Sequence, residues 1–278
     1  MKMRTAFALV FACLVLPMGI QSQIDPETIR EVQRTVCAIK LIDSSGNTVS
    51  LGCGVVLRTR VKNQTGFFVA TAYHIVKGLV SEKGSSLTIS VFDKKGNIFK
   101  SDQIRAKHIV WSNPAMDAAL LVLTGEKEAI NTLPEKYDFP GPASLKLISE
   151  PTWGQEIYLF GYRWLNEDRF IDIVKKGILS VGTKELPGYE GHLIYLIDNM
   201  ANRGMSGGLA FTEEGTGIGI ISSYVYEQGG TFNSEDLSVC LPLTIFFNAM
   251  ASVVISHGDK IINLMNESYI ENPVIEKP

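Results

Sequence analysis

Three residues in separate parts of the sequence have side chains that could together activate a nucleophile: His74, Asp117 and Ser206. A serine hydroxyl attacks a carbonyl carbon well only when a base takes its proton, and imidazole can act as that base near neutral pH. A carboxylate that accepts a hydrogen bond from the imidazole fixes its tautomer. Each residue alone has an ordinary structural explanation, such as an Asx turn for Asp117, whereas the three together predict a catalytic triad.

Ser206 lies in a glycine-rich segment, with Gly204 two residues before it and Gly207 and Gly208 directly after it. Glycines let the backbone turn tightly and bring its N–H groups toward a substrate. A serine nucleophile needs such donors for the negative charge that develops on the attacked carbonyl oxygen. The segment therefore indicates a nucleophile loop, and a glycine-rich turn with an incidental serine is the alternative.

Strand patterns dominate the sequence around these residues. A first series of apolar or alternating segments precedes a proline-rich stretch from Pro134 to Pro151, and a second series follows it. The expected strands are Val36–Ile42, Val49–Leu57, Phe67–Thr71, Ser86–Phe92, Ile104–Trp111 and Ala118–Leu123, then Glu156–Phe160, Phe170–Val181, Leu193–Ile197, Gly207–Phe211, Gly217–Tyr224 and Leu237–Leu241.

Two such series predict an all-β protein with two six-stranded antiparallel β-barrels. Asp25 and Pro26 are typical of a helix N-cap and first helical position, so a short helix to about Arg34 is expected, and a second helix over Ile245–Ile255. The predicted organisation is a signal peptide at 1–22, the N-terminal helix and first barrel at 23–135, a connector at 136–152, the second barrel at 153–243, and the C-terminal helix and tail at 244–278.

The N-terminus has the pattern of a secretory signal peptide. Lys2 and Arg4 precede an apolar run, Ala6–Leu16, which Pro17 and Gly19 end. The run is about half as long as a helix that spans a bilayer, which favours a signal peptide over the alternative, a membrane anchor. The protein is therefore expected to be secreted or periplasmic, without a stable membrane span after signal removal.

Composition and charge exclude some classes of partner. The 278 residues are 45% hydrophobic and 20% charged, and the formal net charge is −3 without any run rich in Lys or Arg. Nucleic-acid binding requires a basic surface, so nucleic acid is not expected as a partner. The spacing of His and Cys matches no metal motif, so neither a metal nor another cofactor is expected. The sequence does not set the oligomeric state.

Two cysteines, Cys37 and Cys53, flank the turn sequence Ser44-Ser45-Gly46-Asn47. If the flanking strands form a hairpin, the two side chains could lie nearly opposite each other. In an oxidising compartment a disulfide between them is one hypothesis, and two buried thiols are the alternative.

The segment Asp198–Gly208 resembles the nucleophile loop of the high-temperature-requirement (HtrA/Deg) protease family, where an aspartate is followed by Asn-Arg-Gly-x-Ser-Gly-Gly. The order His, Asp, Ser is also that of chymotrypsin-like proteases. The likeness extends from about Val36 to Leu243 through weaker matches, which are Gly52-Cys53-Gly54-Val55-Val56, Thr71-Ala72-Tyr73-His74-Ile75-Val76, Asp117-Ala118-Ala119-Leu120-Leu121, Gly154-Gln155-Glu156 with Gly161-Tyr162, and Lys176-Gly177-Ile178-Leu179-Ser180.

This resemblance implies a chymotrypsin-like fold and a serine endopeptidase that hydrolyses peptide bonds of protein or peptide substrates through an acyl-enzyme. It implies that His74 is the general base, that Asp117 orients it, and that Ser206 is the nucleophile. The backbone N–H groups of Gly204 and Ser206 would form the oxyanion hole.

The sequence also departs from the family. The stretch after Leu243 is too short for the peptide-binding PDZ domain that normally follows the protease, so PDZ-based recognition is not expected. Met200 and Ala201 are expected in the specificity pocket, and because no acid stands there, small or medium apolar side chains are expected to be preferred over Arg or Lys. Tyr73 and Met205 are expected to narrow the cleft. Two segments are expected to be surface loops near the cleft: Tyr162–Phe170 and Tyr224–Asp236.

Two other functions fit part of the pattern. The spacing Gly204-x-Ser206-x-Gly208 also occurs at the nucleophile of α/β-hydrolase esterases, and Asp236 and His257 follow in that family's order. That fold needs a helix after the serine, whereas strand and turn are expected here. The second alternative is a catalytically silent double-barrel protein that binds peptides or partner proteins.

Overall fold

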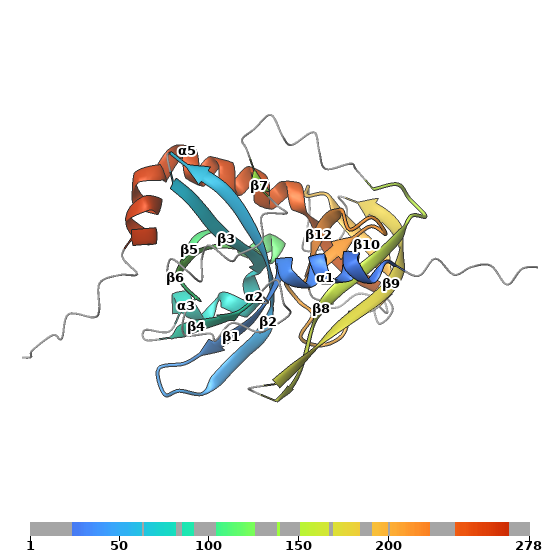
Figure 1. Ribbon diagram of the computed structural model, residues 1–278, viewed down its shortest axis with the longest axis horizontal. Helices are drawn as coiled ribbons and strands as arrows, with labels where there is room; N and C mark the ends of the chain where they lie inside the picture. Colours follow the sequence, from blue (N-terminus) through green and yellow to red (C-terminus); the bar gives the residue numbers. More distant parts are fainter. Residues whose placement is uncertain are drawn as a thin grey trace, which may run out of the picture.

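The computed structural model describes residues 24–62, 64–81, 85–91, 104–125, 138–139, 151–166, 169–183, 191–199, 201–222 and 237–266. Two groups of β-strands lie side by side, with the helix α1 beside their junction and the long helix α5 over one group (Figure 1). The site expected from the sequence therefore draws on both groups.

The first group closes into a barrel of six antiparallel strands. The order is β1-β4-β5-β6-β3-β2, and pairing of β1 with β2 completes the ring. A short seventh strand, β7, adds to β2 in parallel. The strands are β1 (Val36–Ile42), β2 (Thr48–Val61), β3 (Gln64–Ala72), β4 (Ser86–Ser90), β5 (Ile104–Asn113), β6 (Ala118–Gly125) and β7 (Asp138–Phe139).

The second group is a closed barrel with the order β10-β13-β12-β11-β8-β9, and every pairing in it is antiparallel. The prediction of two six-stranded antiparallel barrels is thereby confirmed. The strands are β8 (Glu156–Asn166), β9 (Arg169–Thr183), β10 (Ile194–Asp198), β11 (Leu209–Phe211), β12 (Gly217–Ile221) and β13 (Leu237–Pro242).

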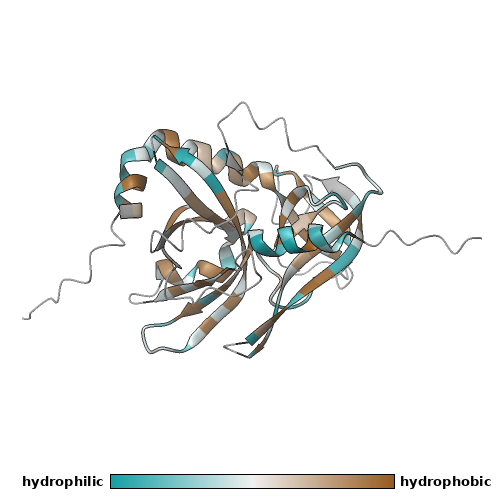
Figure 2. Ribbon diagram, viewed as in Figure 1, coloured by the Kyte–Doolittle hydropathy of each residue, from teal (hydrophilic) through white to brown (hydrophobic). Residues whose placement is uncertain are grey.

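Both expected helices are present. In α1 (Pro26–Thr35), the carboxylate of Asp25 accepts a hydrogen bond from the backbone N–H of Glu27 at 3.2 Å, as an N-cap does. This helix is largely hydrophilic (Figure 2). The second helix, α5 (Leu243–Asn266), is longer than expected, with a kink at His257, and packs mainly on β6. Shorter helical segments are α2 (Tyr73–Val76), α3 (Gly78–Ser81) and the 3-10 turn η1 (Pro114–Met116).

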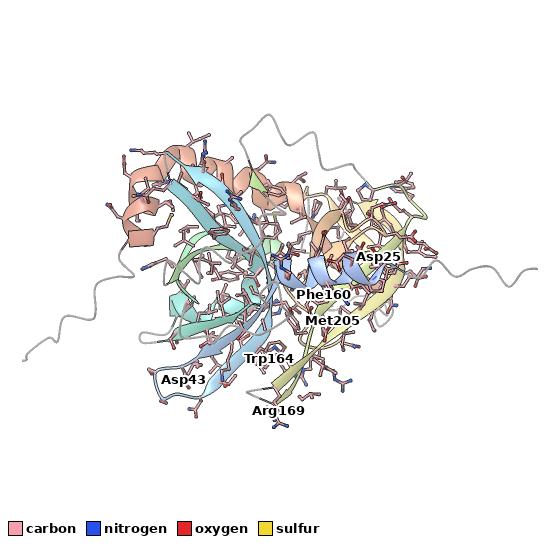
Figure 3. The ribbon with its side chains drawn as sticks, viewed as in Figure 1. Asp25, Asp43, Phe160, Trp164, Arg169 and Met205 are labelled. Atoms are coloured by element: carbon pink, nitrogen blue, oxygen red, sulfur yellow. The ribbon has the colours of Figure 1, made fainter. Side chains whose placement is uncertain are left out.

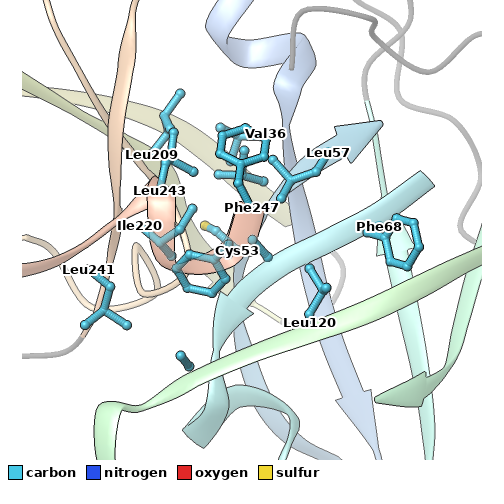
Figure 4. Packing of buried hydrophobic residues seen from close by; sticks show 14 of the residues in the cluster. Val36, Cys53, Leu57, Phe68, Leu120, Leu209, Ile220, Leu241, Leu243 and Phe247 are labelled. Atoms are coloured by element: carbon cyan, nitrogen blue, oxygen red, sulfur yellow. The ribbon is translucent and has the colours of Figure 1, made fainter. Parts of the chain in front are cut away.

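A shared core joins the two barrels. Val36, Leu57 and Phe68 of the first barrel belong to the same buried cluster as Leu209 and Ile220 of the second. Phe247 of α5 lies in the same cluster, and Figure 4 shows these side chains converging from the three parts. Separate buried clusters draw on one barrel each. Because burial of apolar area resists separation, the shared core fixes the relative position of the barrels and of any site between them.

The expectation of a surface loop over Tyr162–Phe170 is wrong. Strand β8 continues to Asn166 and β9 begins at Arg169, so this segment forms most of a long hairpin. The Tyr162 side chain is fully buried, its ring lies 5.5 Å from that of Phe160 and 4.8 Å from that of Phe170, and its hydroxyl donates to the Val36 carbonyl at 2.9 Å. The aromatic residues alternate along β8, which is a strand pattern rather than a loop pattern.

The hypothesis of a disulfide between Cys37 and Cys53 is also wrong, because both thiols are free and buried. Their strands do form the expected hairpin, but Cys37 pairs with Gly54 and Cys53 pairs with Ala38. Side chains at successive strand positions point to opposite faces of a sheet. The two thiols therefore belong to different buried clusters, and the register prevents a bond between them.

The predicted signal peptide at 1–22, most of the connector and the Tyr224–Asp236 segment lie outside the described residues, so the division of the chain at those points stays a prediction. Within the described part, no helix is long and apolar enough to cross a lipid bilayer.

Candidate active site

Strand pairing in the first barrel brings His74 and Asp117 together, although 43 residues separate them in the sequence. Strand β3 pairs with β6 so that Ala72, the last residue of β3, lies opposite Ala118, the first residue of β6. His74 follows in α2 and Asp117 precedes β6. The backbone N–H of Tyr73 donates to the Asp117 carbonyl at 2.9 Å, which closes the two segments against each other.

The Asp117 carboxylate accepts three hydrogen bonds. Its Oδ2 lies 2.8 Å from His74 Nδ1 and accepts from Ser222 Oγ at 2.7 Å, while Oδ1 accepts from the His74 backbone N–H at 2.8 Å. Asp117 has a left-handed backbone (φ 55°, ψ 40°) directly after the η1 turn, a conformation that aspartate tolerates better than most residues. These contacts give the carboxylate a defined partner in the imidazole.

Exposure differs between the two side chains. The His74 side chain is 37% exposed and that of Asp117 is 18% exposed. An imidazole in this position can reach a substrate, while the carboxylate behind it is shielded. Together they can take up a proton and hold the resulting imidazolium, as a general base requires.

Ser206 lies in the loop between β10 and β11. The Ser206 carbonyl accepts from the backbone N–H of Cys53 at 2.7 Å, and the N–H of Gly207 donates to the Ile221 carbonyl at 2.6 Å. Gly207 has a φ of 83°, and a Cβ atom there would lie 1.9 Å from the Cys53 carbonyl oxygen. Only glycine fits so close to β2, so the loop is fixed to both barrels by its backbone.

Cys53 connects this loop to both barrels through its side chain. Its Sγ donates to the Gly204 carbonyl at 3.2 Å and accepts from the Tyr162 backbone N–H at 3.1 Å. Its own carbonyl accepts from the Thr71 hydroxyl at 2.6 Å. Burial raises the pKa of the Cys53 thiol to about 12, which keeps the donating proton on the sulfur at neutral pH.

The backbone N–H groups of Gly204 and Ser206, expected to form the oxyanion hole, have no hydrogen-bond acceptor among the described residues. Gly204 has a φ of 95°, which favours glycine. Two unoccupied amide donors two residues apart can bind an oxygen that develops negative charge.

A cleft of about 690 Å³ joins these groups. Residues of β2 form part of its lining, and residues of β8 and of the loop that carries Ser206 form another part. Figure 3 shows Trp164 between the β1–β2 hairpin and the β8–β9 hairpin. The residues that line the cleft are Thr48, Val49, Ser50, Leu51, His74, Arg163, Trp164, Ala201, Asn202, Arg203, Gly204, Ser206 and Ser222.

His74 and Ser206 thus face one cleft, although no hydrogen bond joins the Ser206 hydroxyl to His74. Hydrogen bonds between catalytic groups are often long before a substrate binds. The three residues picked out by the sequence are brought to one place by the contact between barrels.

Of the described residues expected to shape the specificity pocket or to narrow the cleft, only one lines the cleft in the structure. Ala201 lines the cleft, and its backbone N–H donates to the Ser238 hydroxyl at 2.7 Å, while Met200 lies outside the described residues. The expectation that Tyr73 and Met205 narrow the cleft is wrong for both, since neither lines it. Met205 is fully buried in the second barrel's own cluster, and Tyr73 packs on the first barrel's cluster.

The α/β-hydrolase alternative is excluded by the fold. The segment after Ser206 turns into strand β11 rather than a helix, and both sheets are antiparallel barrels. His257 lies at the kink of α5 and not at the cleft, and Asp236 lies outside the described residues.

Sequence reasoning missed Ser222 and the contacts of Cys53. Ser222 follows the apolar strand β12, and its contact with Asp117 spans 105 residues. No local pattern distinguishes such a serine from others at strand ends. Within the described part of the chain, no cluster of three His, Cys, Asp or Glu side chains is arranged to hold a metal ion.

Comparison with solved structures gives three similar proteins. Deg5 matches with 19% identity and a TM-score of 0.54, over 80% of this chain and 90% of Deg5. A serine endoprotease from Yersinia pestis matches with 19% identity and a TM-score of 0.53, and the HtrA-type protease AlgW, solved with a tripeptide, with 17% identity and a TM-score of 0.54. The two matches cover 82% of this chain but only 66% and 62% of those proteins, less than two thirds of each. At these identities the likeness is one of fold.

No curated protein matches the sequence at a significant level. The family model described as the trypsin-like peptidase domain matches residues 52–220, which is more than half of the chain and includes His74, Asp117 and Ser206. This chain belongs to the trypsin-like peptidase domain family.

Proposed function

We propose that this protein is a secreted serine endopeptidase that hydrolyses peptide bonds with His74, Asp117 and Ser206. The observation that carries the proposal is the hydrogen bond of 2.8 Å between His74 Nδ1 and Asp117 Oδ2, in a pair whose imidazole lines the same cleft as Ser206. A histidine held in this way can serve as the base for the serine hydroxyl.

The first half of the reaction forms an acyl-enzyme. His74 Nε2 takes the proton of Ser206 Oγ as that oxygen attacks the scissile carbonyl carbon. The backbone N–H groups of Gly204 and Ser206 stabilise the negative charge on the carbonyl oxygen, because they are donors without another acceptor among the described residues. The tetrahedral intermediate collapses when His74 gives the proton to the leaving amine.

The second half releases the acid product. Water enters the position of the amine, His74 takes its proton, and the resulting attack on the ester forms a second tetrahedral intermediate. Its collapse returns the proton to Ser206 Oγ. Asp117 stays ionised throughout and stabilises the imidazolium, with its carboxylate held by the bonds from Ser222 and the His74 backbone.

Export of the protein is part of the proposal. It is supported by the N-terminal sequence alone, where Lys2 and Arg4 precede the apolar run Ala6–Leu16. Mass spectrometry of the protein recovered from the culture medium and the periplasm tests it. A mature N-terminus near residue 23 in either fraction is expected, and an intact N-terminus in the cell membrane would indicate an anchor.

Labelling with a fluorophosphonate probe tests the catalytic part. The wild type should be labelled covalently at Ser206, and the variants Ser206→Ala and His74→Ala should not be, although they remain folded. A folded wild type that stays unlabelled would contradict the proposal and favour the catalytically silent peptide- or partner-binding protein. Circular dichroism and thermal unfolding of all three proteins serve as the control for folding.

A further inference from the structure

We propose that the cleft beside Ser206 recognises a carboxylate of the peptide substrate through Arg163 and Arg203. Cleavage would then be favoured next to an acidic side chain or near the free C-terminus of a polypeptide. The inference rests on the proposed peptidase function and adds the class of substrate.

The two arginines come from segments that touch each other. A Cβ atom placed on Gly204 would lie 2.9 Å from the Tyr162 carbonyl oxygen and 3.3 Å from Trp164 Cδ1. The β8 backbone on either side of Arg163 therefore lies against the residue that follows Arg203. The Trp164 ring packs against the tilted ring of Phe170, with ring centroids 4.9 Å apart, and so supports this part of the cleft.

Neither arginine has a counter-charge in the described part of the chain. Both side chains line the cleft and are exposed, and neither takes part in an ion pair or side-chain hydrogen bond with another described residue. The described lining contains no aspartate or glutamate. Two positive charges that line one cleft without an anion raise its electrostatic potential, and a bound carboxylate would offset that charge.

The charge of the cleft contrasts with that of the whole chain, which has a formal net charge of −3. A positive cleft on an acidic protein concentrates anionic substrate at one place. The part of the lining that comes from β2 carries no charged group, since its residues are Thr48, Val49, Ser50 and Leu51. Guanidinium groups bind carboxylates with paired hydrogen bonds. A carboxylate of the bound peptide is therefore the anion that we expect in this cleft.

Peptide binding to the Ser206→Ala variant tests the inference without any turnover. The probes are fluorescein-labelled, alanine-rich peptides, measured by fluorescence anisotropy. In the first set, the C-terminus is amidated and a single Asp, or Asn as its neutral match, is placed at each position in turn. In the second set, the peptides have no acidic side chain, and the C-terminus is either free or amidated. The two sets distinguish a side-chain carboxylate from a terminal one.

At least one carboxylate peptide should bind about fivefold more tightly than its neutral match, and Arg163→Gln or Arg203→Gln should remove most of that difference. Arg163→Glu should reverse the preference in favour of Lys at the same position. The matched control is Arg60→Gln, since Arg60 is exposed on β2 and does not line the cleft. The preference should weaken when the salt concentration is raised from about 50 mM to about 500 mM.

The inference is overturned if Asp and Asn peptides, and free and amidated termini, bind equally, or if no peptide binds, or if Arg60→Gln has the same effect as the cleft variants. Failure of the proposed function is visible separately, because fluorophosphonate labelling uses a neutral reagent that does not need the arginines. If the wild type is labelled but shows no preference for carboxylate peptides, the proposed peptidase function stands and the carboxylate site is ruled out. If the wild type is not labelled but prefers carboxylate peptides, the carboxylate site stands and the peptidase function is ruled out.

Discussion

The thiol of Cys53 donates a hydrogen bond of 3.2 Å to the carbonyl of Gly204, a residue 151 positions away and two before Ser206. The same sulfur accepts from the Tyr162 N–H at 3.1 Å. A side chain that both donates and accepts is needed to satisfy both backbone groups. Cys53 thereby links β2 and β8 to the loop that carries Ser206, at the backbone of the expected oxyanion hole.

Replacement of Cys53 tests this link. Cys53→Ala removes both bonds and should lower the rate of fluorophosphonate labelling and kcat by about tenfold, with a smaller change in KM, because a lost hydrogen bond in a buried site costs about 1–2 kcal/mol. Cys53→Ser keeps a donor and an acceptor and should retain at least about a third of the wild-type rate. Equal losses in the two variants would mean that Cys53 acts through its packing volume and not through its hydrogen bonds.

Ser222→Ala should impair catalysis without unfolding the protein. The variant leaves the Asp117 carboxylate with two of its three hydrogen bonds, both from His74. We expect kcat/KM to fall by about tenfold, since one hydrogen bond to a charged group is worth about 1.5 kcal/mol. Steady-state kinetics on a peptide substrate measure this, with Ser180→Ala on the exposed face of β9 as the control. An unchanged kcat/KM would show that Ser222 only packs beside Asp117.

Gly207→Ala should be far more harmful than the same change at Gly154. Both glycines have a positive φ, 83° and 79°, so both variants bear the cost of that conformation, which is about 1 kcal/mol. Only at Gly207 would the new Cβ meet a neighbour, the Cys53 carbonyl at 1.9 Å, whereas at Gly154 nothing lies within 4 Å. Urea unfolding should show the difference, and labelling of Ser206 should be lost in Gly207→Ala alone. Equal stabilities would contradict the close approach of the loop to β2.

The thiols should make the protein less stable as the pH rises above neutral. Burial raises the pKa of Cys53 to about 12 and also raises those of Cys37 and Cys240. In the unfolded chain a thiol has a pKa of about 8.5. The folded state therefore favours the protonated form, and its stabilisation is fully present below about pH 8.5 and is lost as the pH rises toward about 12.

Thermal unfolding at pH values between about 7.5 and 10 measures this effect, and the midpoint should fall as the unfolded thiols ionise. In Cys240→Val the decline should be shallower. Alkylation at about pH 8, followed by peptide mapping, should find Cys37, Cys53 and Cys240 unmodified in the folded protein and modified after unfolding, because a buried neutral thiol is a poor nucleophile. Rapid alkylation of the folded protein at any of the three would contradict the burial.

Much of the fold follows from local sequence pattern. Alternating apolar residues and turn sequences predicted the strands, and β1 was predicted with the bounds that the structure has, Val36–Ile42. The segment around Ser206 indicated the family, because the glycine-rich loop that carries this serine is specified by residues that are contiguous in the chain. The sequence therefore predicted the types of the candidate catalytic residues and their distribution over the two halves of the chain.

The tertiary structure decided what depends on register and on distant contacts. One residue of register in the β1–β2 hairpin separates Cys37 from Cys53 and rules out their disulfide, and no sequence pattern near either cysteine specifies that register. The contact of Ser222 with Asp117, the thiol hydrogen bond from Cys53 to Gly204, and the close approach of Gly204 to β8 all join segments that are far apart in the chain. Such contacts arise only when two closed barrels bury a common core, because long-range packing sets the final position of each loop.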